Sequence, residues 1–186
     1  MYQILKQIYK TGIKTETPPQ ADESMRLDTQ RLQQQILDVF GGALAIRMVD
    51  AGSCNGCELE IHAVNNAYYN IEGLGIKFVA SPRHADLLLV TGPVSRHMEV
   101  ALKRTYDATP EPKLVVAIGD CARDGGIFCL QGTDGAGESY ATCGKISNVI
   151  PVDVVVSGCP PTPTAILQGI LTAISAKTNL VASAPL

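Results

Sequence analysis

From residue 43 onward, the chain alternates short apolar runs with longer segments that mix apolar and polar residues. The runs LLLV and LVVAI are almost continuously apolar, which is typical of strands buried on both faces of a parallel sheet. Strands that alternate with helices predict a doubly wound, flavodoxin-like α/β sheet with helices on both faces. The expected strands are Ala43–Val49, Gly75–Ala80, Asp86–Thr91, Lys113–Gly119 and Pro151–Ser157, and the expected helices span 57–71, 96–107 and 163–176.

Two local signals refine this outline. Thr162 and Pro163 form a helix-start signal, because threonine is a good N-cap and proline is tolerated in a first helical turn. Residues 123–148 carry several glycines without periodicity and predict a long loop, a kind of segment that is often functional.

Residues 1–42 follow a different pattern. Apolar residues recur at helical spacing from Ile4 to Tyr9 and again from Leu32 to Phe40, with Pro18-Pro19 in a polar linker between them. We therefore expect an N-terminal helical arm over residues 1–42 and one α/β domain over 43–186. The arm either folds back on that domain or docks on a partner or a membrane surface.

Composition narrows the class of protein. The 186 residues are 46% hydrophobic and 18% charged, with a net charge of -3. These values exclude a disordered chain and argue against a nucleic-acid binder, since no basic face is implied. No apolar run is long enough to span a membrane, so we expect a cytosolic chain. Six cysteines in a reducing compartment then favour metal binding or catalysis over disulfides.

Four of the six cysteines follow expected strands. Cys54 and Cys57 come after the first strand, Cys121 after the fourth and Cys159 after the fifth. Parallel strands end at one edge of the sheet, so these thiols are predicted to share one crevice. Four thiolates suit an iron–sulfur cluster or zinc, and a purely redox or structural use of the thiols is a further alternative. Cys129 and Cys143 lie in the glycine-rich loop and are interpreted as non-ligands.

Four separated motifs carry a family resemblance. They are AGSCNGCELEIHAVNN, SPRHADLLLVTGPVSR, VVAIGDCARDGGIF and PVDVVVSGCPPTPTAIL, which together cover about residues 43–175. In this order they resemble the complex I 20 kDa subunit family, and within it the small iron–sulfur subunits of membrane-bound group 4 [NiFe] hydrogenases of the formate hydrogenlyase type. Complex I members have adjacent cysteines at the first site, whereas this chain has CNGC, as in the hydrogenase branch.

The resemblance implies an electron-transfer subunit on the cytoplasmic side of a membrane, held there through partners. Cys54, Cys57, Cys121 and Cys159 would hold one [4Fe-4S] cluster beside the active site of a hydrogenase-type large subunit. Electrons would pass between that site and a ferredoxin-like iron–sulfur subunit, in a complex with membrane subunits, and catalysis would require the large subunit.

Two alternatives remain. The first is a complex I type subunit that delivers electrons to quinone, and it differs only in the chemistry of the large subunit. The second belongs to another class: an interaction module that uses zinc or its free thiols.

A few other residues are candidates for chemistry. Glu58 and Glu60 follow the CNGC motif, and an acidic residue there is associated with proton movement in similar small subunits, so either is a candidate proton relay. The alternative is a carboxylate favoured by the helix dipole. Gly92, at the end of the third strand, is expected to allow close backbone approach to the cluster. His84 and His97 are interpreted as surface or capping residues, and His62 as a packed or exposed residue of the helix after CNGC.

Overall fold

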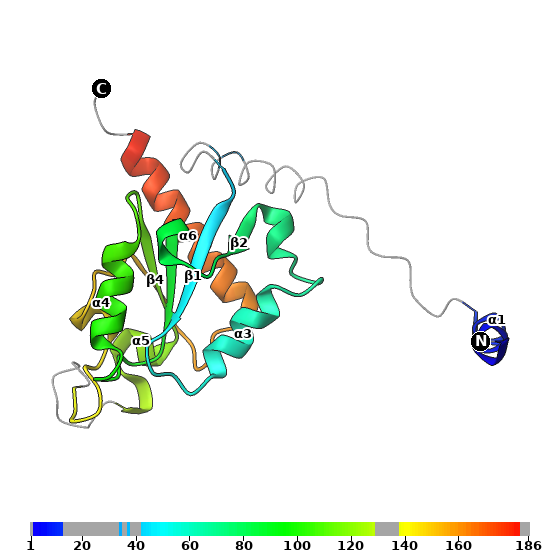
Figure 1. Cartoon of the computed structure of the whole chain (residues 1–186), viewed down its shortest axis with the longest axis horizontal. Coiled ribbons are helices and arrows are strands. Elements are labelled where there is room, and N and C mark those ends of the chain that lie inside the picture. Colours follow the sequence, from blue (N-terminus) through cyan, green and yellow to red (C-terminus); the bar gives the residue numbers. More distant parts are fainter. Residues whose placement is uncertain (1, 13–33, 35–36, 38–41, 129–137, 183–186) are drawn as a thin grey trace.

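The computed structural model describes residues 2–12, 34, 37, 42–128 and 138–182, and its body is a five-stranded parallel sheet flanked by helices (Figure 1). The strands lie in the order β2-β1-β3-β4-β5. This is the flavodoxin-like order, so the predicted fold class is confirmed. The elements are α1 (Tyr2–Thr11), β1 (Leu44–Asp50), α3 (Gly56–Val64), β2 (Ile76–Phe78), β3 (Leu87–Thr91), α4 (Glu99–Ala108), β4 (Leu114–Ile118), α5 (Asp120–Asp124), β5 (Val154–Val156) and α6 (Pro163–Ala182).

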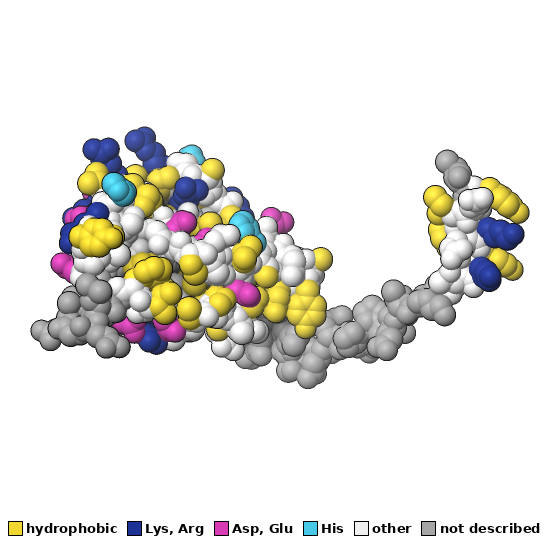
Figure 2. Space-filling model, turned by 90° about the horizontal axis from the view of Figure 1, so that it is seen from below, with side chains coloured by type: hydrophobic (Ala, Val, Ile, Leu, Met, Phe, Trp, Pro, Cys, Tyr) yellow, Lys and Arg dark blue, Asp and Glu magenta, His cyan; other side chains and the backbone are white. Residues whose placement is uncertain are grey.

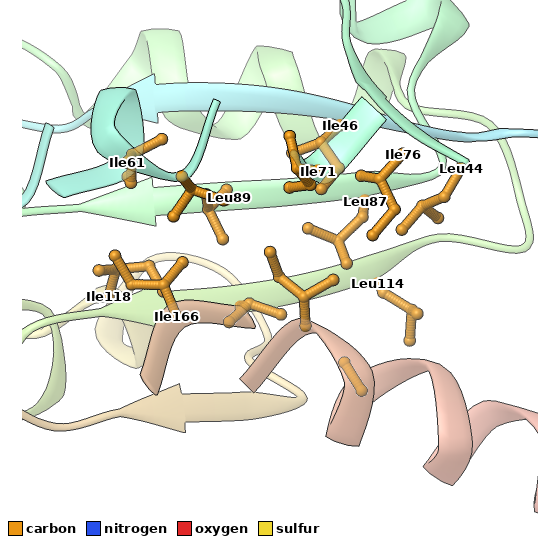
Figure 3. Close-up of a cluster of buried hydrophobic side chains, with 14 of the residues drawn as sticks. Leu44, Ile46, Ile61, Ile71, Ile76, Leu87, Leu89, Leu114, Ile118 and Ile166 are labelled. Carbon is orange, nitrogen blue, oxygen red and sulfur yellow. The ribbon is translucent and has the colours of Figure 1, made fainter. Parts of the chain in front are cut away.

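Alternate residues of the central strands face opposite sides of the sheet, and helices cover both sides. Leu87 and Leu89 of β3 pack in a core with residues of α3 and α6, whereas Leu88 and Val90 pack with residues of α4 and α5. Figure 3 shows the first of these cores, to which α6 contributes Ile166. Every residue of β3 and β4 is buried, which confirms the prediction from their continuous apolar runs.

The helix expected over residues 57–71 ends earlier, at Val64. Just beyond it, the side-chain oxygen of Asn66 accepts hydrogen bonds from the backbone N–H groups of Tyr68 (2.8 Å) and Tyr69 (3.0 Å). Asparagine competes in this way with the helical ladder, so the chain leaves the helix and makes a short 3₁₀ turn at Ile71–Leu74 before β2.

The last helix starts at Pro163, as predicted, and runs beyond residue 176 to Ala182. The hydroxyl of Thr162 accepts a hydrogen bond from the Ala165 N–H at 3.3 Å, so Thr162 is its N-cap. The expected loop over 123–148 includes short 3₁₀ turns at Gly126–Phe128 and Ile146–Asn148, while residues 129–137 lie outside the described residues.

The first amphipathic pattern forms the predicted helix, α1, and all of its side chains are exposed. In the second pattern only residues 34 and 37 are described, both as helical, and the rest of that expected helix lies outside the described residues. The division into an arm over 1–42 and a domain over 43–186 stays a prediction. Within the described ranges, no helix is long and apolar enough to cross a bilayer.

Candidate metal centre

The four strand-end cysteines line one pocket at the carboxyl edge of the sheet. The pocket has a volume of about 100 Å³, and we call it the cysteine pocket. Loops after β1, β4 and β5 supply its walls, as the strand-end placement predicts. Its lining residues are Ser53, Cys54, Gly56, Cys57, Asp120, Cys121, Gly158, Cys159 and Pro160.

The loop after β1 is held in a tight turn that presents the first two thiols. The Asp50 side chain accepts hydrogen bonds from the N–H groups of Gly52 and Ser53, both at 2.8 Å. Asn55 then adopts the left-handed conformation (φ 71°) and α3 begins at Gly56. Cys57 therefore lies in the first turn of α3, where the helix dipole favours negative charge.

Gly92 permits a close approach, although not to the cysteine pocket. A Cβ at Gly92 would lie 2.6 Å from the backbone nitrogen of Ser53, so the end of β3 presses directly on the loop that carries Cys54. Gly92 is not among the residues that line the pocket. The expectation that it approaches a cluster is therefore corrected: its close neighbour is the backbone of Ser53.

A polar network joins the loops of Cys121 and Cys159. The Asp120 N–H donates to the Gly158 carbonyl at 2.9 Å, and the Gly158 N–H donates to the Asp120 carboxylate at 3.0 Å. Arg123 donates to the same carboxylate at 3.0 Å and to the Ser157 hydroxyl at 2.9 Å. We call Asp120, Arg123, Ser157 and Gly158 the loop clamp, because they fix the two cysteine loops relative to each other.

Two glycines leave room for the sulfur atoms. A Cβ at Gly119 (φ +93°) would lie 2.7 Å from Cys57 Sγ, and one at Gly126 (φ +50°) would lie 2.9 Å from Cys121 Sγ. Real Cβ atoms do not come so close, so each sulfur packs directly on glycine backbone. The pocket is therefore shaped around thiols, and any larger residue at Gly119 or Gly126 would displace one of them.

The thiols also lie within electrostatic range of one another. Burial raises the pKa of Cys57 to about 12, with additional contributions from Glu58 and then from Cys121, Cys54 and Cys159. Burial, followed by Cys159 and Cys54, also raises the pKa of Cys121, whereas a backbone hydrogen bond from Ile127 works in the opposite direction. Four thiolates in this space repel one another unless a cation lies between them, and a bound metal deprotonates its thiol ligands.

The described residues include no group of three or more His, Cys, Asp or Glu side chains placed to hold a single metal ion. Four thiolates on one zinc, each about 2.3 Å from the metal, would lie only about 4 Å apart. In a [4Fe-4S] cluster, each cysteine binds a different iron, so the ligands stand farther apart around a larger group. The chemistry of the donor set, four cysteine thiols lining one pocket, is of the kind that such a cluster uses.

Glu58 and Glu60 are equal candidates for a proton relay at the level of sequence, but they differ in burial in the structure. Glu58 is 4% exposed, and neither oxygen of its carboxyl group has a hydrogen-bond partner within the described part of the chain. Glu60 is only half-buried. A buried polar group without a partner costs stability, so it is a recurrent mark of a functional residue.

Cys143 and the three histidines are not among the residues that line the pocket. Cys143 is buried in the core on the α4 side, and its thiol donates a hydrogen bond to the Glu99 carboxylate at 3.4 Å. This placement agrees with its interpretation as a non-ligand, while Cys129 lies outside the described residues. The three histidines, His62, His84 and His97, are exposed, as expected.

Three large apolar side chains close in sequence to Cys57 and Cys121 are exposed, which the sequence pattern did not predict. Leu59 is 60% exposed two residues after Cys57, and Ile127 and Phe128 are 80% and 42% exposed after the Cys121 loop. Cys54 and Cys159 are also exposed, so the pocket is open on one side. Only their exposure, which depends on the folded chain, distinguishes these three residues from core residues.

Fold and pocket define an α/β protein with four cysteines gathered at the carboxyl edge of its sheet. A family model described as the 20 kDa subunit of NADH ubiquinone oxidoreductase matches residues 54–173. The chain therefore belongs to this family of oxidoreductase subunits, as the sequence motifs predict.

The similar proteins come from both branches of the family. The chain is 41% identical to the probable membrane-bound hydrogenase subunit mbhJ of Pyrococcus furiosus, over 83% of this chain and 89% of that protein. It is 38% identical to formate hydrogenlyase subunit 7 of Escherichia coli, over 84% of this chain and 57% of that protein. An NADH-quinone oxidoreductase subunit of Herpetosiphon aurantiacus is 44% identical over 62% of this chain and 60% of its own length.

A solved structure extends the similarity to the fold. A chain from the membrane-bound sulfane sulfur reductase, an archaeal respiratory membrane complex, superposes with a TM-score of 0.62 and 30% sequence identity. The match covers 82% of this chain and 76% of the other.

Proposed function

We propose that the chain carries one [4Fe-4S] cluster on Cys54, Cys57, Cys121 and Cys159 and transfers electrons within an energy-converting [NiFe] hydrogenase complex of the formate hydrogenlyase type. The observation that carries this proposal is the convergence of four thiols from three loops on one pocket. Membership of the family and similarity to hydrogenase subunits support it.

When bound, such a cluster would accept and release one electron at a time. The chain's own residues position it and tune its surroundings. Gly119 and Gly126 leave space for two ligand sulfurs, and the loop clamp holds two of the cysteine loops together. The first turn of α3 and the hydrogen bond from Ile127 to Cys121 favour negative charge on the sulfurs.

The open side of the pocket is the proposed contact with a hydrogenase-type large subunit. Leu59, Ile127 and Phe128 would be covered by that subunit together with the exposed thiols of Cys54 and Cys159. A ferredoxin-like iron–sulfur subunit would exchange electrons with the cluster, and membrane subunits would complete the assembly. The chain would then be peripheral, on the cytoplasmic side of the membrane, and inactive without the large subunit.

Glu58 is the proposed proton-carrying group of this interface, in preference to Glu60. It follows Cys57 directly, it is buried, and its carboxyl group has no hydrogen-bond partner among the described residues. A carboxyl group in that setting can take up and release a proton without first breaking an existing bond. The competing interpretation, a carboxylate placed only to favour the helix dipole, does not account for its burial.

A second candidate function is the reduction of quinone by a complex I type assembly, favoured by the 44% identity to an NADH-quinone oxidoreductase subunit. The metal content of the purified complex separates the two. We expect about one nickel per copy of this chain when the large subunit is co-purified, since a [NiFe] site requires it. A nickel-free complex that reduces quinone would instead assign the chain to the complex I type.

The interaction module of another class makes a different prediction. If zinc or free thiols served only to bind a partner, the purified chain would contain no iron, and replacing Cys121 with serine would alter partner binding alone. Metal analysis of the chain therefore decides between the cluster and this alternative.

The loop clamp gives a prediction about the durability of the cluster. Arg123→Ala removes the ion pair to Asp120 and the hydrogen bond to Ser157, together with the ion pair to Asp124, so the loops of Cys121 and Cys159 should separate more easily. We expect a chelator to remove iron from this variant about tenfold faster than from the unmodified protein. The loss is monitored by the decrease in visible absorbance. Arg96→Ala is the matched control, since Arg96 pairs with Glu138 outside the pocket lining. Equal rates for the two variants would show that the clamp does not retain the cluster.

A further inference from the structure

Helix α1 has two chemically distinct faces. At about 100° per residue, its large apolar side chains fall within an arc of about 160°, and the remaining arc holds only polar residues. The apolar face consists of Tyr2, Ile4, Leu5, Ile8 and Tyr9, and the polar face of Gln3, Lys6, Gln7, Lys10 and Thr11.

This apolar face has no packing partner in the described structure. Its side chains are between 59% and 92% exposed, and none of the helix is buried (Figure 2). A helix of 10 residues is below the length at which isolated helices are stable in water, so a surface is needed to support it. Single apolar residues on a protein surface are normal, but five large ones on one face of a helix form a patch of the kind that marks an interaction site.

The charge of the N-terminal segment indicates which kind of surface α1 contacts. Residues 1–15 contain three lysines and no acidic residue, although the whole chain carries a net charge of -3. Lysines on the polar face beside a broad apolar arc are typical of helices that lie in the headgroup region of a bilayer. Tyr2 and Tyr9 lie at the margin of the apolar arc, next to Lys6, where an aromatic ring with a hydroxyl group suits the boundary between lipid and water.

We propose that α1 binds directly to a lipid bilayer with anionic headgroups, parallel to its surface, with Ile4, Leu5 and Ile8 in the acyl boundary. The lysines and the broad apolar arc favour a bilayer over an apolar groove in a protein. A groove would need only a narrow row of apolar side chains along the helix. The contact is independent of the cysteine pocket. It gives the chain a membrane contact of its own, in addition to any through partner subunits.

The test uses the full chain, purified anaerobically, with vesicles of phosphatidylcholine alone or mixed with phosphatidylglycerol. We expect co-sedimentation with the mixed vesicles, weaker binding to phosphatidylcholine, and a rise in helical circular dichroism on binding. Ile4→Gln with Ile8→Gln should weaken binding to both vesicles by about tenfold or more. Lys6→Gln with Lys10→Gln should weaken binding to the mixed vesicles about tenfold and leave binding to phosphatidylcholine unchanged.

Gln3→Ala with Gln7→Ala is the matched control, because it changes the polar face and keeps every apolar anchor and every charge. It should bind as the unmodified chain does. Failure of the unmodified chain to bind either vesicle overturns the proposal, as does unchanged binding of the double isoleucine variant. If the chain ignores vesicles while that variant drops out of the purified complex, the face belongs to a protein groove and the lipid contact is refuted. None of these results depends on iron.

Discussion

Replacing Cys121 with serine is expected to remove the cluster from the chain. A serine oxygen is a hard ligand that binds the iron of a cluster poorly, and Cys121, in the first turn of α5, is the one proposed ligand that follows β4. Iron content should fall from about four atoms per chain to a small fraction of that, with loss of the brown colour. Iron and acid-labile sulfide assays measure the change, and circular dichroism should show an intact fold, because the Cys121 side chain belongs to neither of the two apolar cores.

Cys143→Ser is the matched control for this variant. Cys143 is buried and hydrogen-bonded to Glu99, so its replacement should lower stability without loss of iron. Full iron in the Cys121 variant would contradict the proposed ligand set. Loss of iron from the Cys143 variant, with its fold intact, would show that the spare and ligand cysteines have been assigned wrongly.

Replacing Glu58 with glutamine is expected to lower turnover of the assembled complex by about a hundredfold, the scale on which a positioned proton donor acts. Glutamine keeps the size of the side chain and cannot carry the proton. Cluster content and the electron paramagnetic resonance signal should be unchanged, because Glu58 does not line the cysteine pocket. The measurement is hydrogen or quinone turnover, compared with cluster reduction in the same preparation.

Glu60→Gln serves as the control, since Glu60 is only half-buried and should tolerate the change with turnover within about twofold. Thermal unfolding separates the relay from a structural role. If Glu58 only complemented the helix dipole, its replacement would lower the melting temperature and leave turnover unchanged, and that outcome would contradict the relay.

The strand pattern predicted the position of the thiols because two simple regularities apply. Continuous apolar runs indicate strands buried on both faces, and parallel strands end at one edge, so residues just after Asp50, Ile118 and Val156 had to meet there. The early end of α3 could not be predicted in the same way. It depends on the side chain of Asn66, which satisfies two backbone N–H groups that a longer helix would have used.

The support of the cysteine pocket depends on contacts between residues far apart in the sequence. Gly119 meets Cys57, and Asp120 meets Gly158, only once β1, β4 and β5 are brought together in the sheet. The same reason applies to Glu58, because its burial follows from the packing of α3 and not from its place after the CNGC motif. For Gly92 the sequence predicted a close backbone approach correctly but named the wrong neighbour, because the contact is with Ser53.

The central claim is that this chain holds one iron–sulfur cluster, and the most direct measurement is the iron, sulfide and zinc content of the unmodified chain purified without oxygen. We predict about four irons and four acid-labile sulfides per chain, with a paramagnetic signal on reduction. An iron-free chain that contains zinc, or no metal after reconstitution with iron and sulfide, would contradict the claim.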